Sequence, residues 1–124
     1  MNTRYLGLQD VLYLAKRLGE PTPRDIGLVA SAVARPRTTV FGADAYPDLH
    51  TKAAALLHSL ARNHAFVDGN KRVSWLAAGA FHWANGYELD APDDPAYDLV
   101  IRAATGESDV PEIAAALAGW VRPR

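Results

Sequence analysis

The chain has 124 residues, a formal net charge of −1 at pH 7 and no cysteine. This length accommodates one hydrophobic core, so we expect a single domain over residues 1–124. The lack of cysteine excludes disulfides and thiolate metal sites and is typical of a reducing cytoplasm. The charge gives no indication of direct nucleic-acid binding, and no apolar run approaches the ~18 residues of a membrane span. The N-terminus also lacks the apolar region of a signal peptide. We therefore expect a soluble, globular, cytoplasmic protein.

Apolar residues recur at helical spacing along most of the chain. The first predicted helix stops where Gly19, Pro21 and Pro23 follow it, because proline cannot continue a helix. The pair Asn85-Gly86 gives the fourth helix a favourable left-handed ending. The pattern therefore predicts an all-α fold, a compact bundle of about six helices. These helices are expected at about residues 9–18, 24–34, 48–63, 70–85, 95–104 and 111–121.

Residues 35–47 break this pattern, since they show no helical period. The stretch Thr38–Phe41 is β-prone and Gly42 favours a turn. A loop of this length in a small domain is often functional. One interpretation is a connection that crosses the surface, and the other is an extended flap that presents a strand edge to a partner peptide. We expect Arg35 and Arg37 to be solvated, with a contact between Arg37 and a target or nucleotide as the alternative.

The most informative stretch is HAFVDGNKR, residues 64–72. Asp68-Gly69 favours a tight turn, and Asn70 is a good N-cap for the helix that follows. Lys71 and Arg72 then stand at a helix N-terminus, where the helix dipole disfavours cations. The arrangement becomes favourable when an anion binds there, and a phosphate is the natural candidate.

The other side chains of this stretch suit phosphoryl chemistry. A histidine such as His64 can accept a proton from an attacking hydroxyl near neutral pH. Asp68 suffices as a protein ligand for Mg²⁺ when substrate phosphates complete the coordination. Each residue also has a simpler interpretation: His64 as a helix C-terminal histidine, Asp68 as a turn residue, Asn70 as a cap. Phe66 is expected to be buried and to fix the loop.

These residues resemble a known family. HAFVDGNKR is similar to the signature HxFx(D/N)(A/G)NKR of the Doc (death-on-curing) toxins, a branch of the Fic fold. The flanking stretches Tyr46–Leu49, Lys52–Leu57 and Asn85–Tyr87 are similar too. The resemblance implies a small all-α toxin encoded with an antitoxin, which transfers the γ-phosphate of ATP to a threonine of elongation factor Tu. It also implies a Phd-like antitoxin whose disordered tail folds onto the toxin as a helix.

The resemblance also implies a role for each residue of the motif. His64 would be the general base for the target hydroxyl, and Asp68 would hold Mg²⁺. The phosphates of the nucleotide would be held by the backbone N–H groups near Gly69 and by Asn70, Lys71 and Arg72.

Departures from related patterns favour phosphate transfer over AMP transfer. AMP-transferring Fic enzymes resemble HPFxxGNGRxxR, whereas this chain has Lys71 in place of the second glycine and Trp75 in place of the final arginine. The lysine would block the close approach of phosphates to the backbone, and the arginine's phosphate contact is absent. Ala65 replaces the common proline, which should loosen the loop slightly. A nucleotidyl transferase and a catalytically silent binding module remain the alternatives.

Other signals are weaker. Ser108–Glu112 is the nearest match to the inhibitory (S/T)xxxE(G/N) helix of many Fic proteins, but Pro111 and Ile113 make it a chance match. The remaining histidines, His50, His58 and His82, lie on helical patterns with no carboxylate at ligand spacing and are expected to be structural rather than metal ligands. The tryptophans, Trp75, Trp83 and Trp120, are expected in the core or in subunit contacts rather than as base-stacking platforms.

Overall fold

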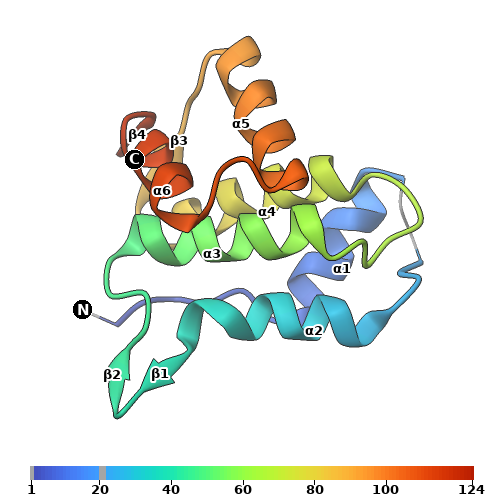
Figure 1. The fold of residues 1–124 in the computed structure, drawn as a ribbon, viewed down its shortest axis with the longest axis horizontal. Helices are drawn as coiled ribbons and strands as arrows, with labels where there is room; N and C mark the ends of the chain where they lie inside the picture. The colour runs from blue at the N-terminus through green and yellow to red at the C-terminus, as the bar shows by residue number, and fades with distance from the viewer. Residues whose placement is uncertain (1, 20–21) are drawn as a thin grey trace.

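The computed structural model describes residues 2–19 and 22–124, and within them the chain forms six α-helices and two short strand pairs (Figure 1). The predicted all-α bundle is therefore confirmed. Pro21, predicted to stop the first helix, lies outside the described residues. The elements are α1 (Leu8–Arg17), α2 (Ile26–Ala34), the 3₁₀ turn η1 (Arg35–Arg37), β1 (Thr39–Val40), β2 (Ala43–Asp44), α3 (Leu49–Arg62), α4 (Asn70–Ala84), β3 (Tyr87–Leu89), α5 (Asp93–Thr105), α6 (Val110–Ala118) and β4 (Val121–Pro123).

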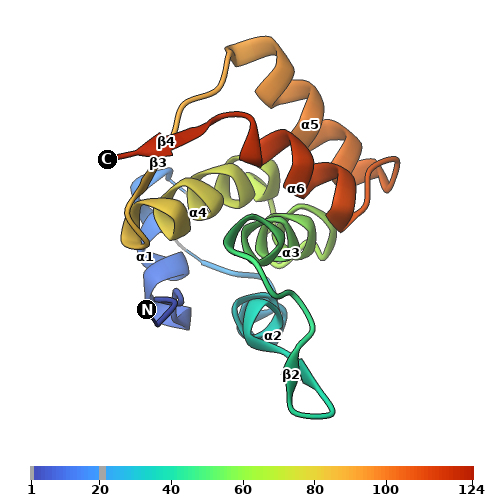
Figure 2. The same ribbon diagram turned by 90° about the vertical axis from the view of Figure 1, so that its left-hand side faces the viewer.

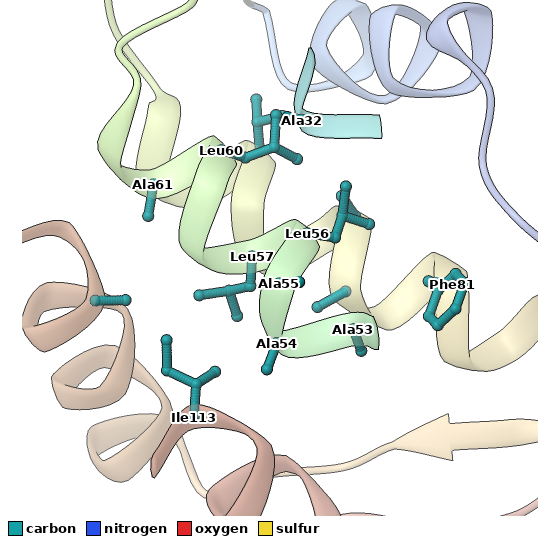
Figure 3. Close-up of a cluster of buried hydrophobic side chains, with 14 of the residues drawn as sticks. Ala32, Ala53, Ala54, Ala55, Leu56, Leu57, Leu60, Ala61, Phe81 and Ile113 are labelled. Atoms are coloured by element: carbon teal, nitrogen blue, oxygen red, sulfur yellow. The ribbon is translucent and has the colours of Figure 1, made fainter. Parts of the chain in front are cut away.

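Helix α3 lies at the centre of the bundle. Helices α2, α4, α5 and α6 all pack against it, as the two views in Figures 1 and 2 show. The helical spacing predicts an apolar stripe of Leu49, Ala53, Leu56, Leu57 and Leu60 on this helix. The last four are almost fully buried, whereas Leu49 is partly buried, and Figure 3 shows the four buried side chains between the surrounding helices. Burial of a leucine side chain contributes about 1.5–3 kcal/mol, so this stripe fixes the position of α3 and of the loop that follows it.

Aspartates are the N-cap residues of three of the helices. Asp25 Oδ1 accepts a hydrogen bond from the Leu28 amide at 3.3 Å, and Asp48 Oδ1 accepts one from Thr51 at 2.9 Å. Asp109 forms a capping box with Glu112 at the start of α6. Because Asp25 is the N-cap, α2 begins at Ile26 rather than at residue 24, where the pattern placed it. Glu112, part of the chance match to an inhibitory motif, is engaged in this capping box.

Residues 35–47 form a turn and a hairpin rather than a helix. Thr39 pairs with Asp44 and Val40 with Ala43, and the two turn residues, Phe41 and Gly42, both have positive φ angles, as in a type I′ turn. The hairpin stands at the N-terminal end of α3, whereas the motif loop follows the C-terminal end (Figure 1). A helix of 14 residues is about 21 Å long, so the expected flap and the motif are far apart.

The prediction for Arg35 is wrong, because this arginine is half-buried rather than solvated. Its Nε donates to Tyr46 Oη at 2.9 Å, and its Nη1 lies 2.8 Å from His58 Nδ1 and 3.0 Å from Ser59 Oγ. The guanidinium therefore joins η1 to α3. Arg37 is exposed and lies over the ring of Tyr5, at 4.6 Å from its centroid, at the hairpin end of the molecule.

A second strand pair, which the sequence pattern missed, closes the C-terminus. β3 and β4 are antiparallel, and Arg122 in β4 lies 3.4 Å from Glu88 and 3.3 Å from Asp90. Residue 121 therefore belongs to a strand, and α6 ends at Ala118, three residues before the predicted end. Three-residue strands are too short to leave a clear alternation of apolar and polar residues. No helix within the described residues is long and apolar enough to span a membrane.

Candidate functional site

The motif loop connects α3 to α4, and His64 lies at its start. Asn63 is the C-cap of α3, and His64 follows with a φ of 52°. This left-handed backbone costs a residue other than glycine roughly 1–2 kcal/mol. The side chain of His64 is exposed. The protein therefore holds an accessible imidazole on a backbone conformation that the surrounding contacts must maintain.

The side chain of Asn63 supplies two of these contacts. Its Nδ2 donates to the Leu28 carbonyl at 2.9 Å, and its Oδ1 accepts from the Ala65 amide at 3.2 Å. A proline at position 65, common in the family that the motif resembles, has no N–H for the second bond. Ala65 is fully buried. The loosening expected from alanine is therefore opposed by a hydrogen bond that proline cannot make.

The segment before α2 holds the loop from the other side. Arg24 Nη2 donates to the carbonyl of His64 at 2.7 Å, and the Asp25 amide donates to the carbonyl of Ala65 at 3.1 Å. Pro23 and Phe66 also form an isolated antiparallel bridge. Sequence reasoning missed Arg24 because it lies 40 residues before the histidine, and no local pattern links the two positions.

Two hydrogen bonds between Phe66 and Asn70 close the loop. Phe66 is 2% exposed, so the predicted buried position is confirmed. The Asn70 side chain accepts from the Phe66 amide at 3.0 Å and donates to the Phe66 carbonyl at 2.9 Å. The predicted N-cap is wrong: Gly69, with a φ of 78°, is the N-cap, and Asn70 is the first helical residue. Glycine adopts this conformation without steric cost.

Asp68 lies at the tip of the loop, exposed to solvent. Its Oδ1 accepts from the amide of Gly69 at 2.8 Å, which orients the carboxylate beside the start of α4. Among residues 2–19 and 22–124, no three histidine, cysteine or acidic side chains are close enough together to hold a metal ion. A carboxylate such as that of Asp68 is an oxygen ligand of the kind that Mg²⁺ prefers.

Lys71 and Arg72 are exposed in the first turn of α4, as the motif predicted. The amides of a helix's first turn have no acceptor within the helix, and the dipole adds partial positive charge there. Two cationic side chains and these amides together favour an anion such as a phosphate. The structure thus brings His64, Asp68, Lys71 and Arg72 to one short segment at the end of the bundle.

A cavity of about 430 Å³ opens beside these two cations. A second cavity of about 420 Å³ shares Trp75 and Leu76 with it and extends along α4 to Trp83. Trp75 is half-buried and packs edge-on against Trp120, with ring centroids 6.3 Å apart. Because they share Trp75 and Leu76 along α4, the two cavities are here together called the α4 groove. Its other lining residues include Leu18, Gly79, Ala80, Leu89, Ala91, Asp93, Ala96, Tyr97, Val100 and Ile101.

The other histidines have partners away from the loop. Burial lowers the pKa of His58, and the nearby cation of Arg35 lowers it further. Burial also lowers the pKa of His82, whose Nδ1 lies 2.9 Å from the Ala78 carbonyl and whose Nε2 lies 3.2 Å from His50 Nδ1. These contacts hold helices together, in agreement with the expected structural role.

A small helical bundle whose α3–α4 loop and first α4 turn carry an imidazole, a carboxylate and two cations is what the resemblance to the Fic fold leads us to expect. The sequence profile of the Fic/DOC family matches residues 5–82, which include the whole motif, and the chain belongs to this family, in its Doc branch. The chain is 53% identical to "Toxin Doc" of Mycolicibacterium smegmatis over 95% of its own length and 94% of the relative's. It is 34% identical to "Protein kinase doc" of Escherichia phage P1, over 77% and 75% of the two chains.

Proposed function

We propose that this protein is the toxin of a toxin–antitoxin system and a Mg²⁺- and ATP-dependent protein kinase. Its substrate would be a threonine of elongation factor Tu, so that phosphorylation blocks translation in the cytoplasm. The observation that carries the proposal is the motif loop, where an exposed imidazole precedes a helix N-terminus bearing Lys71 and Arg72. The names of the two relatives, a toxin and a protein kinase, support it.

In the proposed phosphoryl transfer, each functional group of the motif has its own role. His64 accepts the proton of the target hydroxyl as that oxygen attacks the γ-phosphorus. The new oxygen–phosphorus bond forms while the bond between the γ-phosphorus and the β–γ bridging oxygen breaks, and ADP leaves. Lys71, Arg72 and the amides at the start of α4 hold the phosphates and balance their charge. Asn70, which the resemblance made a phosphate ligand, acts in this proposal through the loop instead, because both ends of its side-chain amide bind the Phe66 backbone.

Mg²⁺ would be held by Asp68 together with phosphate oxygens, and it would supply charge neutralisation. This assignment rests on the exposed carboxylate beside the helix N-terminus. Gly69 contributes by its left-handed backbone, which turns the chain into α4.

Transfer of the γ-phosphate is favoured over transfer of AMP. Trp75, which replaces the final arginine of the AMP-transferring pattern, packs against Trp120 and lines the α4 groove. It offers no cation for a terminal phosphate. Lys71 places a side chain where those enzymes have glycine.

The test is to incubate the purified protein with elongation factor Tu, Mg²⁺ and ATP labelled at either the α- or the γ-phosphate. The intact mass of the factor is read beside that of a sample treated with His64→Ala. A gain of one phosphoryl group that the variant does not produce supports the proposal. A gain of one AMP would instead make the chain a nucleotidyl transferase. No gain, with no binding of Mg-ATP by calorimetry, would favour a silent binding module.

We further propose that the cognate Phd-like antitoxin folds its tail as a helix into the α4 groove. The groove runs from Lys71 to Trp83, about 18 Å along the helix, and this length suits three turns of a partner helix. Its lining is mainly apolar, and the cavity at one end is lined by the cations Lys71 and Arg72 and by one carboxylate, that of Asp93. This pattern fits an amphipathic helix with acidic residues at one terminus.

A charged residue introduced into the groove tests whether the antitoxin binds there. We expect Leu76→Glu to weaken binding of the antitoxin encoded beside this protein by at least about a hundredfold, because a carboxylate would be desolvated in the groove. Phe41→Glu, at the exposed hairpin tip, is the matched control and should leave the affinity unchanged. Equal affinities for the two variants would place the antitoxin elsewhere.

A further inference from the structure

The bond between Arg24 and His64 has no place in the chemistry above, yet it joins two distant parts of the chain at the motif. Arg24 lies just before the N-cap of α2, and its guanidinium donates to the His64 carbonyl at 2.7 Å. A bond from a charged donor is shorter and stronger than one between neutral groups. The position of Arg24 is itself fixed, because the adjacent Asp25 donates its amide to Ala65 and caps α2 with its side chain.

The backbone of His64 needs such a contact. With a φ of 52°, this residue lies in a region that histidine rarely adopts, so its conformation depends on what binds the peptides around it. Asn63 binds the amide of Ala65, Asp25 binds the carbonyl of Ala65, and Arg24 binds the carbonyl of His64 itself. Arg24 and Asn63 therefore bind the two polar groups of the peptide directly after the histidine, and Arg24 is the residue that reaches its carbonyl from outside the loop.

We propose that Arg24 is a positioning residue, which holds His64 in its left-handed conformation and thereby aims the imidazole at the target hydroxyl. The proposal rests on the proposed kinase function. A misplacement of about 1 Å between reacting groups is enough to slow a reaction considerably. Loss of Arg24 should therefore lower kcat while the binding of nucleotide, which involves Lys71 and Arg72, changes little.

A phosphate-binding role is the main competitor, because Arg24 is exposed and carries a charge close to the motif. The two roles differ in their kinetic signature. A phosphate ligand that acts in the ground state raises the KM for ATP when it is removed, whereas a positioning residue lowers kcat. The two roles also predict different results for the protein without substrate, because only a positioning residue orders the loop of the free protein.

The experiment compares Arg24→Ala, Arg24→Lys and Arg4→Ala with the wild type. Arg4→Ala removes one exposed charge at the far end of α4, where the backbone of Arg4, rather than its side chain, binds Asn85. The first readout is the backbone chemical shift and ¹⁵N relaxation of residues 64–66, which requires no substrate. The second is kcat and KM for ATP in phosphorylation of elongation factor Tu.

We expect Arg24→Ala to disorder residues 64–66 and to lower kcat about tenfold or more, the size expected for one charge-assisted bond, with KM for ATP nearly unchanged. Arg24→Lys, which keeps a charged donor, should recover most of the loss, and Arg4→Ala should match the wild type. An unchanged loop in Arg24→Ala, or a higher KM with unchanged kcat, would overturn the proposal. If the wild type does not phosphorylate the factor, the proposed substrate fails, and the loop measurement alone decides the role of Arg24.

Discussion

The side-chain amide of Asn70 takes the place of a backbone partner for Phe66. Its Oδ1 accepts from the Phe66 amide at 3.0 Å and its Nδ2 donates to the Phe66 carbonyl at 2.9 Å, so both polar groups of a loop residue are satisfied by one residue of α4. The ring of Phe66 is buried in the core. The loop that carries His64 and Asp68 is thus held to the bundle by the buried ring of Phe66 and by the side-chain amide of Asn70.

We expect Asn70→Ala to lower the free energy of unfolding by about 1–3 kcal/mol, because it leaves two partly buried backbone groups without their partner. Phosphate transfer should fall strongly as well, since the motif loop loses its shape. Urea denaturation and the transfer assay measure the two effects.

Asn85 supplies a matched control for this variant. Its amide makes the same pair of bonds with the backbone of Arg4, both at 2.8 Å, at the far end of α4. Asn85→Ala should cost a similar amount of stability and leave the rate of transfer per folded molecule unchanged. Equal loss of transfer in both variants would mean that stability alone, and not the shape of the loop, explains the effect of Asn70.

Because His64 has a left-handed backbone, its glycine and alanine variants should differ in stability in the opposite direction to that at most positions. At most positions glycine is less stable than alanine, because it gains more freedom on unfolding. At position 64 we expect His64→Gly to be more stable than His64→Ala by about 1 kcal/mol, since alanine keeps the steric cost at a φ of 52° and glycine does not. Both variants should lose transfer. Thermal unfolding compares them, and a more stable alanine variant would mean that the residue is not left-handed in solution.

Asp68 has a structural role that substitution by asparagine can separate from metal binding. The side chain of the Asp68→Asn variant would keep an oxygen acceptor for the Gly69 amide but would lose the charge that Mg²⁺ prefers. We expect this variant to change stability by less than about 0.5 kcal/mol and to slow transfer by about a hundredfold or more. Asp109→Asn is the control, because asparagine caps a helix as well as aspartate does. Transfer by Asp68→Asn at the wild-type rate, with unchanged Mg²⁺ dependence, would remove Asp68 from the site.

How much of the molecule the sequence predicts depends on how local each feature is. Leu56 and Leu60 lie within one helix, and their period predicts that they are buried, although Ala54, Ala55 and Ala61 outside the predicted stripe are buried as well. The chemistry of residues 64–72 is equally local, since one short stretch of the chain carries the imidazole, the carboxylate and both cations. The extent of α3 follows from its own residues in the same way.

Contacts between residues that are far apart in the chain could not be predicted from the sequence. Arg24 meets His64 across 40 positions, and Arg35 meets Tyr46 and His58 through a partly buried network. An exposed arginine and a buried one look the same in a single sequence, because their environment is set by the packing of other elements. The pairing of β3 with β4 joins residues on either side of two helices and escaped notice for the same reason.

The buried histidines predict how stability depends on pH. Burial lowers the pKa of His58 and of His82 below the ordinary 6.5, with the cation of Arg35 adding to the effect at His58. Between the lowered native pKa and 6.5 the unfolded chain binds more protons than the folded one, so the free energy of unfolding rises with pH. The contribution is complete above pH 6.5 and is lost as the pH falls through the native pKa of each histidine.

Urea denaturation between about pH 5 and pH 8 should therefore show a protein that weakens on acidification. His58→Gln and His82→Gln should each be less stable at about pH 8, because each loses hydrogen bonds, but each should depend less on pH than the wild type. The variant that combines His58→Gln with His82→Gln should show the smallest change in the free energy of unfolding with pH. A slope that is unchanged in the double variant would mean that other groups control the response to acid.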